Sequence, residues 1–255
     1  MSNYDRNYRF GAQVGQKAAA EIDQGLRAYM IGVYNYMTLG LGVTGLAALG
    51  AFMLANPQFH GHKLVELSPF GQAIYLSPLR WVIVLAPLGF VMFLGAKANS
   101  ISAATARTLF LVFAALVGLS MSSLLVVYTG ASVAQVFFVT AAAFGGLSLY
   151  GYLTKRDLSA IGSFLIMGVW GLVIAGVVNL FLHSSSLQFG LSILAVLIFS
   201  GLTAYDTQAI KDQYYESDGW EVTQKKSIFG ALMLYLDFIN MFQSLLYLFG
   251  QQRSN

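Results

Sequence analysis

The chain has 255 residues, of which 57% are hydrophobic and only 10% carry a charge. Soluble domains have about 25% charged residues, so the composition excludes an ordinary soluble protein. The absence of cysteine excludes disulfides, thiol catalysis and cysteine-based metal sites. The net charge of +3 says little about partners by itself, and the sequence has no recognisable nucleic-acid-binding module.

Two long uncharged stretches determine the fold class. No charged residue occurs between Arg107 and Lys155, or between Asp157 and Asp206. Each stretch is long enough for two membrane spans of about 20 residues with a turn between them. The apolar runs are continuous, whereas a membrane barrel needs short alternating segments. We therefore predict an all-α polytopic membrane protein.

The elements follow from the apolar segments in chain order. Residues 1–28 form a polar arm without the apolar segment of a cleavable signal peptide. Seven transmembrane helices follow over residues 29–250, and residues 251–255 form a short C-terminal tail. The predicted helices cover residues 29–55, 79–96, 107–128, 133–153, 159–182, 189–210 and 227–250.

The distribution of positive charge predicts the orientation. With seven spans the termini lie on opposite sides, and an N-terminus in the cytoplasm leaves only Lys63, Arg80 and Arg253 outside. The other eleven Lys and Arg residues then lie inside, as the positive-inside rule requires. We predict an N-terminus in and a C-terminus out.

Glycine is frequent within the predicted spans. Small residues allow membrane helices to approach closely, so we expect these glycines to mark helix contacts rather than chemistry. Examples are Gly40, Gly42, Gly45, Gly145, Gly146, Gly168 and Gly171.

Two aspartates, Asp206 and Asp237, lie inside predicted spans, whereas the other nine acidic residues lie in the arm, in loops or at helix ends. A carboxylate in the membrane is costly and therefore indicates a functional site. Asn240 and Ser244 share a helical face with Asp237, and Thr203 shares one with Asp206. The sixth and seventh spans are neighbours in sequence, which allows the two carboxylates to meet.

A pair of carboxylates in a low-dielectric site tends to share a proton, because both cannot ionise cheaply. When both are ionised, the pair is a hard oxygen site that attracts Ca²⁺, with too few ligands for tight binding. This chemistry fits a proton sensor with weak, transient cation passage. In the alternative interpretation, each aspartate separately bonds to a buried polar group.

The segments Thr203-Ala-Tyr-Asp206-Thr-Gln208-Ala-Ile-Lys211 and Leu234-Tyr-Leu-Asp237-Phe-Ile-Asn240-Met-Phe resemble the two signature segments of the Bax inhibitor-1 family. The resemblance covers about residues 29–250. It implies a bundle with the seventh helix at its centre. It also implies a pH-sensitive calcium leak governed by an aspartate pair, which maps onto Asp206 and Asp237. No cofactor is implied, and protons and Ca²⁺ are the expected partners besides the lipid bilayer.

The resemblance also bears on localisation and partners. A bacterial member would lie in the inner (plasma) membrane, and some relatives associate with a membrane-bound AAA protease. The alternative function is therefore a non-transporting modulator of such a protease or of a stress-response complex. Family members can carry an arginine as a partner for the aspartates near the end of the second span. Here the candidates for that role are Lys97 and Arg107.

Other interpretations have weaker support. Tyr205-Asp206 resembles half of an intramembrane aspartyl protease site, but Asp237 lacks the Gly-x-Gly-Asp context of the second half. His60-Gly-His62 offers two metal ligands without a third. We therefore predict that the protein is not an enzyme.

Overall fold

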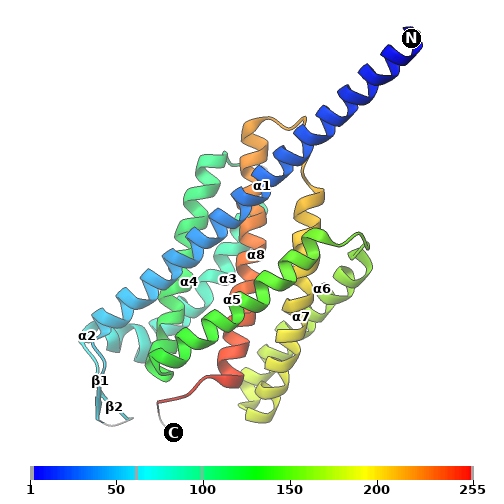
Figure 1. The fold of residues 1–255 in the computed structure, drawn as a ribbon. Helices are drawn as coiled ribbons and strands as arrows, with labels where there is room; N and C mark the ends of the chain where they lie inside the picture. The colour runs from blue at the N-terminus through cyan, green and yellow to red at the C-terminus, as the bar shows by residue number, and fades with distance from the viewer. Residues whose placement is uncertain (1–2, 61–62, 99, 254–255) are drawn as a thin grey trace.

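The computed structural model describes residues 3–60, 63–98 and 100–253, with side chains described from residue 24 except those of His60 and Lys63. Within this part of the chain, seven helices are long and apolar enough to cross a membrane. This confirms the all-α fold with seven spans (Figure 1). The seven helices are α1 (Asn3–Ala55), α3 (Leu79–Lys97), α4 (Ala103–Val127), α5 (Gly130–Leu153), α6 (Ser159–Leu182), α7 (Ser185–Asp212) and α8 (Trp220–Phe249).

Several helices begin earlier than the apolar pattern predicts, because polar side chains cap their first turns. Ser102 accepts a hydrogen bond from the Thr105 amide at the start of α4. Thr129 and Ser184 accept bonds in the same way at the starts of α5 and α7. Capped polar turns extend a helix beyond its apolar segment. Helix α1 also begins before the predicted first span, because it runs without a break from Asn3 through the predicted arm to Ala55. Its apolar part is Gln24–Ala55.

The predicted loop at 56–78 contains structure of its own. Strands β1 (Gln58–His60) and β2 (Lys63–Glu66) form an antiparallel hairpin. A short helix α2 (Pro69–Gly71) and a π-helical turn η1 (Gln72–Leu76) lead into α3. The hairpin lies at the same end of the bundle as the C-terminus (Figure 1). Arg253 of the C-terminal tail stacks over Phe59 of β1, with its guanidinium carbon 4.7 Å from the ring centre.

Helix α8 is the most buried of the seven spans and packs against α1, α4, α5 and α7. The last helix is therefore central, as the family resemblance implies. Helices α3 and α6 lie further out, since they pack mainly on α4 and α7 respectively. The start of α1 and the end of α8 lie at opposite ends of the bundle (Figure 1). We call these ends the N-side and the C-side.

The glycines divide into two groups. Gly40 packs against Phe110, and Gly168 packs against Ile198, so both mark helix contacts as predicted. The prediction is wrong for Gly42, Gly45, Gly145, Gly146 and Gly171, where an added Cβ would meet no heavy atom within 4 Å. The closest helix crossings lie elsewhere, at Gly118 against the backbone of Thr44 and at Gly151 against the backbone of Ala204.

Candidate functional site

The structure brings the two membrane aspartates together on neighbouring helices. Asp206 of α7 is 8% exposed and Asp237 of α8 is 3% exposed. Their carboxyl groups are within hydrogen-bonding reach of one another. Helices α7 and α8 pack along each other, which holds this contact in place.

Both carboxyl groups line a cavity of about 560 Å³ between α3, α6, α7 and α8. Along α7 the cavity extends from Asp206 to Gln188, which is 18 residues, or about 27 Å at 1.5 Å per residue. Gln188 lies close to the C-side end of α7, whereas Asp206 lies close to its N-side end. The cavity therefore connects the aspartate pair with the C-side half of the bundle.

No side chain or backbone donor in the described part of the chain hydrogen-bonds to either carboxylate, beyond the contact between the pair. Asp237 Oδ2 is buried and has no hydrogen-bond partner among these residues. Burial of an unsatisfied carboxylate oxygen is costly, and natural structures keep few such groups without a functional reason. Separate hydrogen bonds to polar neighbours, the alternative interpretation of the sequence, are not what the structure contains.

The supporting polar residues predicted from the sequence bond to their own helices. Asn240 and Ser244 line the cavity, where the Asn240 amide donates to Leu236 O and the Ser244 hydroxyl donates to Asn240 O. Thr203 is fully buried outside the cavity lining and donates to Phe199 O. The side-chain oxygen of Asn240 thus stays available on the cavity wall, whereas Thr203 contributes to the packing of α7.

The predicted cationic partners lie apart from the aspartates. Lys97 is the last residue of α3, and Arg107 lies in the second turn of α4. Both side chains are exposed, and neither lines the cavity. Among the described residues the one ion pair is Lys226 with Asp218, so neither cation pairs with Asp206 or Asp237.

Sequence reasoning missed three further polar residues of the cavity wall, namely Gln188, Ser192 and Gln243. Gln188 precedes Asp206 by 18 residues, which is five helical turns, so the two side chains share a face of α7. Gln243 follows Asn240 by three residues and extends the polar stripe of α8. The 3.6-residue period, applied backward from Asp206 and forward from Asn240, is the signal that would have identified them.

On the N-side of the pair the same two helices pack against each other. Ile210, one turn beyond Asp206, is fully buried. It contacts Gly230, where an added Cβ would lie 3.0 Å from Ile210 Cγ2. This apolar contact lies on the N-side of Asp206, outside the cavity lining.

The described residues contain no group of three or more histidine, aspartate or glutamate side chains that could hold a metal ion. The side chains of His60 and His62 lie outside the part of the chain that the structure describes.

Comparison with known proteins decides the family. The family model described as "Inhibitor of apoptosis-promoting Bax1" matches residues 26–254. The chain belongs to the Bax inhibitor-1 family. It is 44% identical to the uncharacterised protein RP147 of Rickettsia prowazekii over 91% of this chain and 92% of that protein. It is 43% identical to the inner membrane protein YbhL of Escherichia coli K12, over 90% and 94% of the two chains.

The first signature segment of this Bax inhibitor-1 family protein also holds helix ends together on the N-side. Gln208 accepts a hydrogen bond from the Leu158 amide and donates one to Arg156 O, which fixes the turn between α5 and α6. Lys211 Nζ donates to Tyr152 O at the end of α5. A lysine at this position satisfies a free helix carbonyl and complements the helix dipole. Asp206 alone among the polar residues of this segment faces the cavity.

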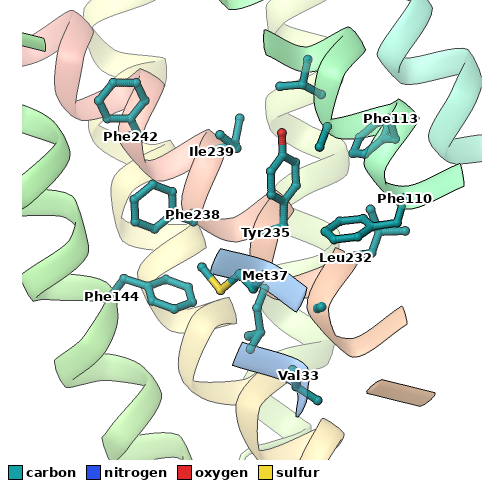
Figure 2. Packing of buried hydrophobic residues seen from close by; sticks show 14 of the residues in the cluster. Val33, Met37, Phe110, Phe113, Phe144, Leu232, Tyr235, Phe238, Ile239 and Phe242 are labelled. Carbon is teal, nitrogen blue, oxygen red and sulfur yellow. The ribbon is translucent and has the colours of Figure 1, made fainter. Parts of the chain in front are cut away.

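The second segment of this family protein gives α8 two distinct faces. Asp237 and Asn240 face the cavity, whereas Tyr235, Phe238 and Phe242 belong to the hydrophobic core. Figure 2 shows Tyr235 between the rings of Phe110 and Phe113 on one side and Phe238 on the other. The Tyr235 hydroxyl lies 2.6 Å from Thr44 Oγ1, so α8 is tied to α1 at the centre of the bundle.

Proposed function

We propose that this membrane protein of the Bax inhibitor-1 family is a pH-sensitive leak channel for cations, with Ca²⁺ as the favoured ion. The observation that carries the proposal is the contact between two buried carboxyl groups that line one cavity, where no cation and no hydrogen-bond donor of the described residues is paired with them. YbhL, a relative, is an inner membrane protein, which supports the same location for this chain. The charge distribution of the sequence supports an N-terminus in the cytoplasm.

The proposed mechanism depends on the protonation of the pair. A shared proton lets the carboxyl groups hydrogen-bond to each other across α7 and α8. When both groups are ionised, they repel each other and attract a cation. Both effects are strong because the effective dielectric constant of a buried site is low. Carboxylate oxygens, with the neutral oxygens of Asn240 and Ser244 nearby, are the hard ligands that Ca²⁺ prefers. Four such groups are too few for storage, which fits passage.

The proposed gate is the apolar contact between Ile210 and Gly230. Ions enter from the C-side along the polar wall of Gln188, Ser192 and Gln243 and reach the aspartates. Repulsion within the ionised pair pushes α7 and α8 apart, and the contact on the N-side lies one turn away. The proton-bridged pair keeps the two helices together.

The experiment is a flux measurement in liposomes loaded with a calcium-sensitive dye, from about pH 5 to about pH 8. We expect the flux of the parent protein to change with pH and Asp206→Asn and Asp237→Asn to lose this dependence. An amide cannot titrate, so either change removes the shared proton.

The matched control is Asp157→Asn in the exposed turn between α5 and α6. Hydrogen bonds from Ser159 hold the pKa of the Asp157 carboxyl below its usual value, so this group stays ionised over the pH range of the experiment. The control should behave as the parent does. If both cavity variants kept the pH dependence of the parent, the proposal would be wrong.

The second candidate function is an interaction role with a membrane-bound AAA protease. Helix α1 continues to Asn3, past the ends of the other helices on the N-side, and offers a protein partner an extended contact surface (Figure 1). Deletion of residues 1–28 is expected to abolish co-purification with the protease and to leave calcium flux intact. Retention of the protease by the shortened protein would contradict this role.

A further inference from the structure

A groove separate from the aspartate cavity lies between α1 and α5. It has a volume of about 740 Å³, and α8 supplies its floor at Phe238. Its wall is mainly apolar, with Met30, Met37 and Phe144 among its residues. Figure 2 shows Met37, Phe144 and Phe238 next to one another. A second hollow of about 380 Å³ continues toward the C-side and shares Leu41 and Phe238 with the first.

The groove exists because α1 and α5 pack mainly on other helices rather than along each other. Helix α1 packs on α4 and α8, whereas α5 packs on α7 and α8. Two glycines deepen the space between them, Gly145 in the first hollow and Gly45 in the second. Neither approaches a neighbouring helix, since an added Cβ would meet nothing within 4 Å. Glycine weakens a helix relative to alanine, and at these two positions the missing side chain leaves space in the groove.

The dimensions of the groove match one membrane leaflet. Along α1 the first hollow extends from Arg27 to Leu41, which is about 21 Å at 1.5 Å per residue. A bilayer with its head groups is about 40–45 Å thick, so one leaflet accounts for about half of that. Arg27 then lies at the level of the head groups, and Leu41 lies near the middle of the membrane.

The polar groups of the groove fit a phosphate at one end and hydrocarbon along the rest. Tyr34 Oη and Ser148 Oγ lie 2.7 Å apart and hydrogen-bond to each other. A bound molecule therefore does not have to supply a hydrogen bond to either hydroxyl group. Arg27 contributes a guanidinium group, which binds phosphate through two parallel hydrogen bonds. Lys211 adds a second positive charge beside the wall residue Tyr152, with Nζ 5.8 Å from the ring centre.

From these observations we propose that the groove between α1 and α5 binds an anionic phospholipid of the N-side leaflet. One acyl chain fills the space between Met37, Phe144 and Phe238, and the phosphate lies at Arg27. The site is independent of the aspartate cavity, which lies between α3, α6, α7 and α8.

Native mass spectrometry of the full chain tests the proposal, with phosphatidylglycerol and phosphatidylcholine added in equal amounts. The parent should retain phosphatidylglycerol in preference to phosphatidylcholine. Gly145→Phe places a ring in the groove and should lose the bound lipid. Gly146→Phe is the matched control, because Gly146 also faces open space but does not line the groove, and it should bind as the parent does.

Arg27→Gln tests the head-group contact without changing the groove. We expect affinity for phosphatidylglycerol to fall about tenfold and the preference over phosphatidylcholine to disappear. This variant keeps the test decisive if Gly145→Phe does not fold. Equal retention of lipid by the two glycine variants would overturn the proposal, as would a preference that survives Arg27→Gln. A dimer of the chain in place of the lipid adduct would identify a second copy as the occupant and would also overturn it.

Discussion

Gly176→Phe is expected to reduce calcium flux to the level of protein-free liposomes. Gly176 of α6 lines the aspartate cavity, and an added Cβ there would meet no heavy atom within 4 Å. A phenyl ring therefore enters the cavity without displacing the helix backbone. If ions pass along this wall to Asp206 and Asp237, the ring stands in their path.

The control for this variant is Gly171→Phe on the same helix. Gly171 also faces open space, but it does not line the cavity. Dye-loaded liposomes should therefore show parental flux for Gly171→Phe and none for Gly176→Phe at matched protein content. Equal flux from the two variants would place the ion pathway outside this cavity.

Gly151→Leu is expected to prevent formation of a stable bundle. An added Cβ at Gly151 would overlap with the carbonyl oxygen of Ala204, and a backbone atom cannot move aside as a side chain can. Overpacking of a core costs about 1–3 kcal/mol, and a clash with backbone lies at or beyond the upper end. Helix α7 would have to leave α5, and α7 carries Asp206.

Gly146→Leu on the same helix provides the comparison, because its side chain would project into open space. Thermal unfolding in detergent, followed by size-exclusion chromatography, should give a lower midpoint for Gly151→Leu or no monodisperse protein at all. The midpoint of Gly146→Leu should stay at or above that of the parent, since leucine favours helix over glycine. Similar midpoints for both variants would mean that close packing of α5 on α7 at Gly151 is not needed for a stable bundle.

The seven spans were predictable because their signal is long and continuous. An uncharged stretch such as that from Arg107 to Lys155 admits few interpretations in a membrane protein. The helix ends were less predictable, because capping residues such as Ser102 and Thr129 begin a helix within polar sequence. Which helices contact α8 depends on tertiary packing, and no periodicity in α3 or α6 indicates that they lie further out.

The two aspartates were identifiable from the cost of a carboxylate in the membrane, and the structure brings them together. Their surroundings were harder to predict. Lys97 and Arg107 have the right charge but lie at exposed helix ends, where positive residues also serve as membrane anchors. The role of each glycine depends on what faces it, so Gly145 and Gly151 look alike in sequence although one opens a groove and the other allows a helix contact.

If Asp206 and Asp237 act as one titrating unit, infrared spectroscopy of the protein in lipid should detect the proton that they share. The carboxylic acid C=O band of the parent should change in intensity over the same pH range in which flux changes. Asp206→Asn and Asp237→Asn should each move that change to another pH range, because the carboxyl group that remains then titrates alone. An unaltered pH-dependent band in both variants would mean that the two aspartates do not titrate as a pair.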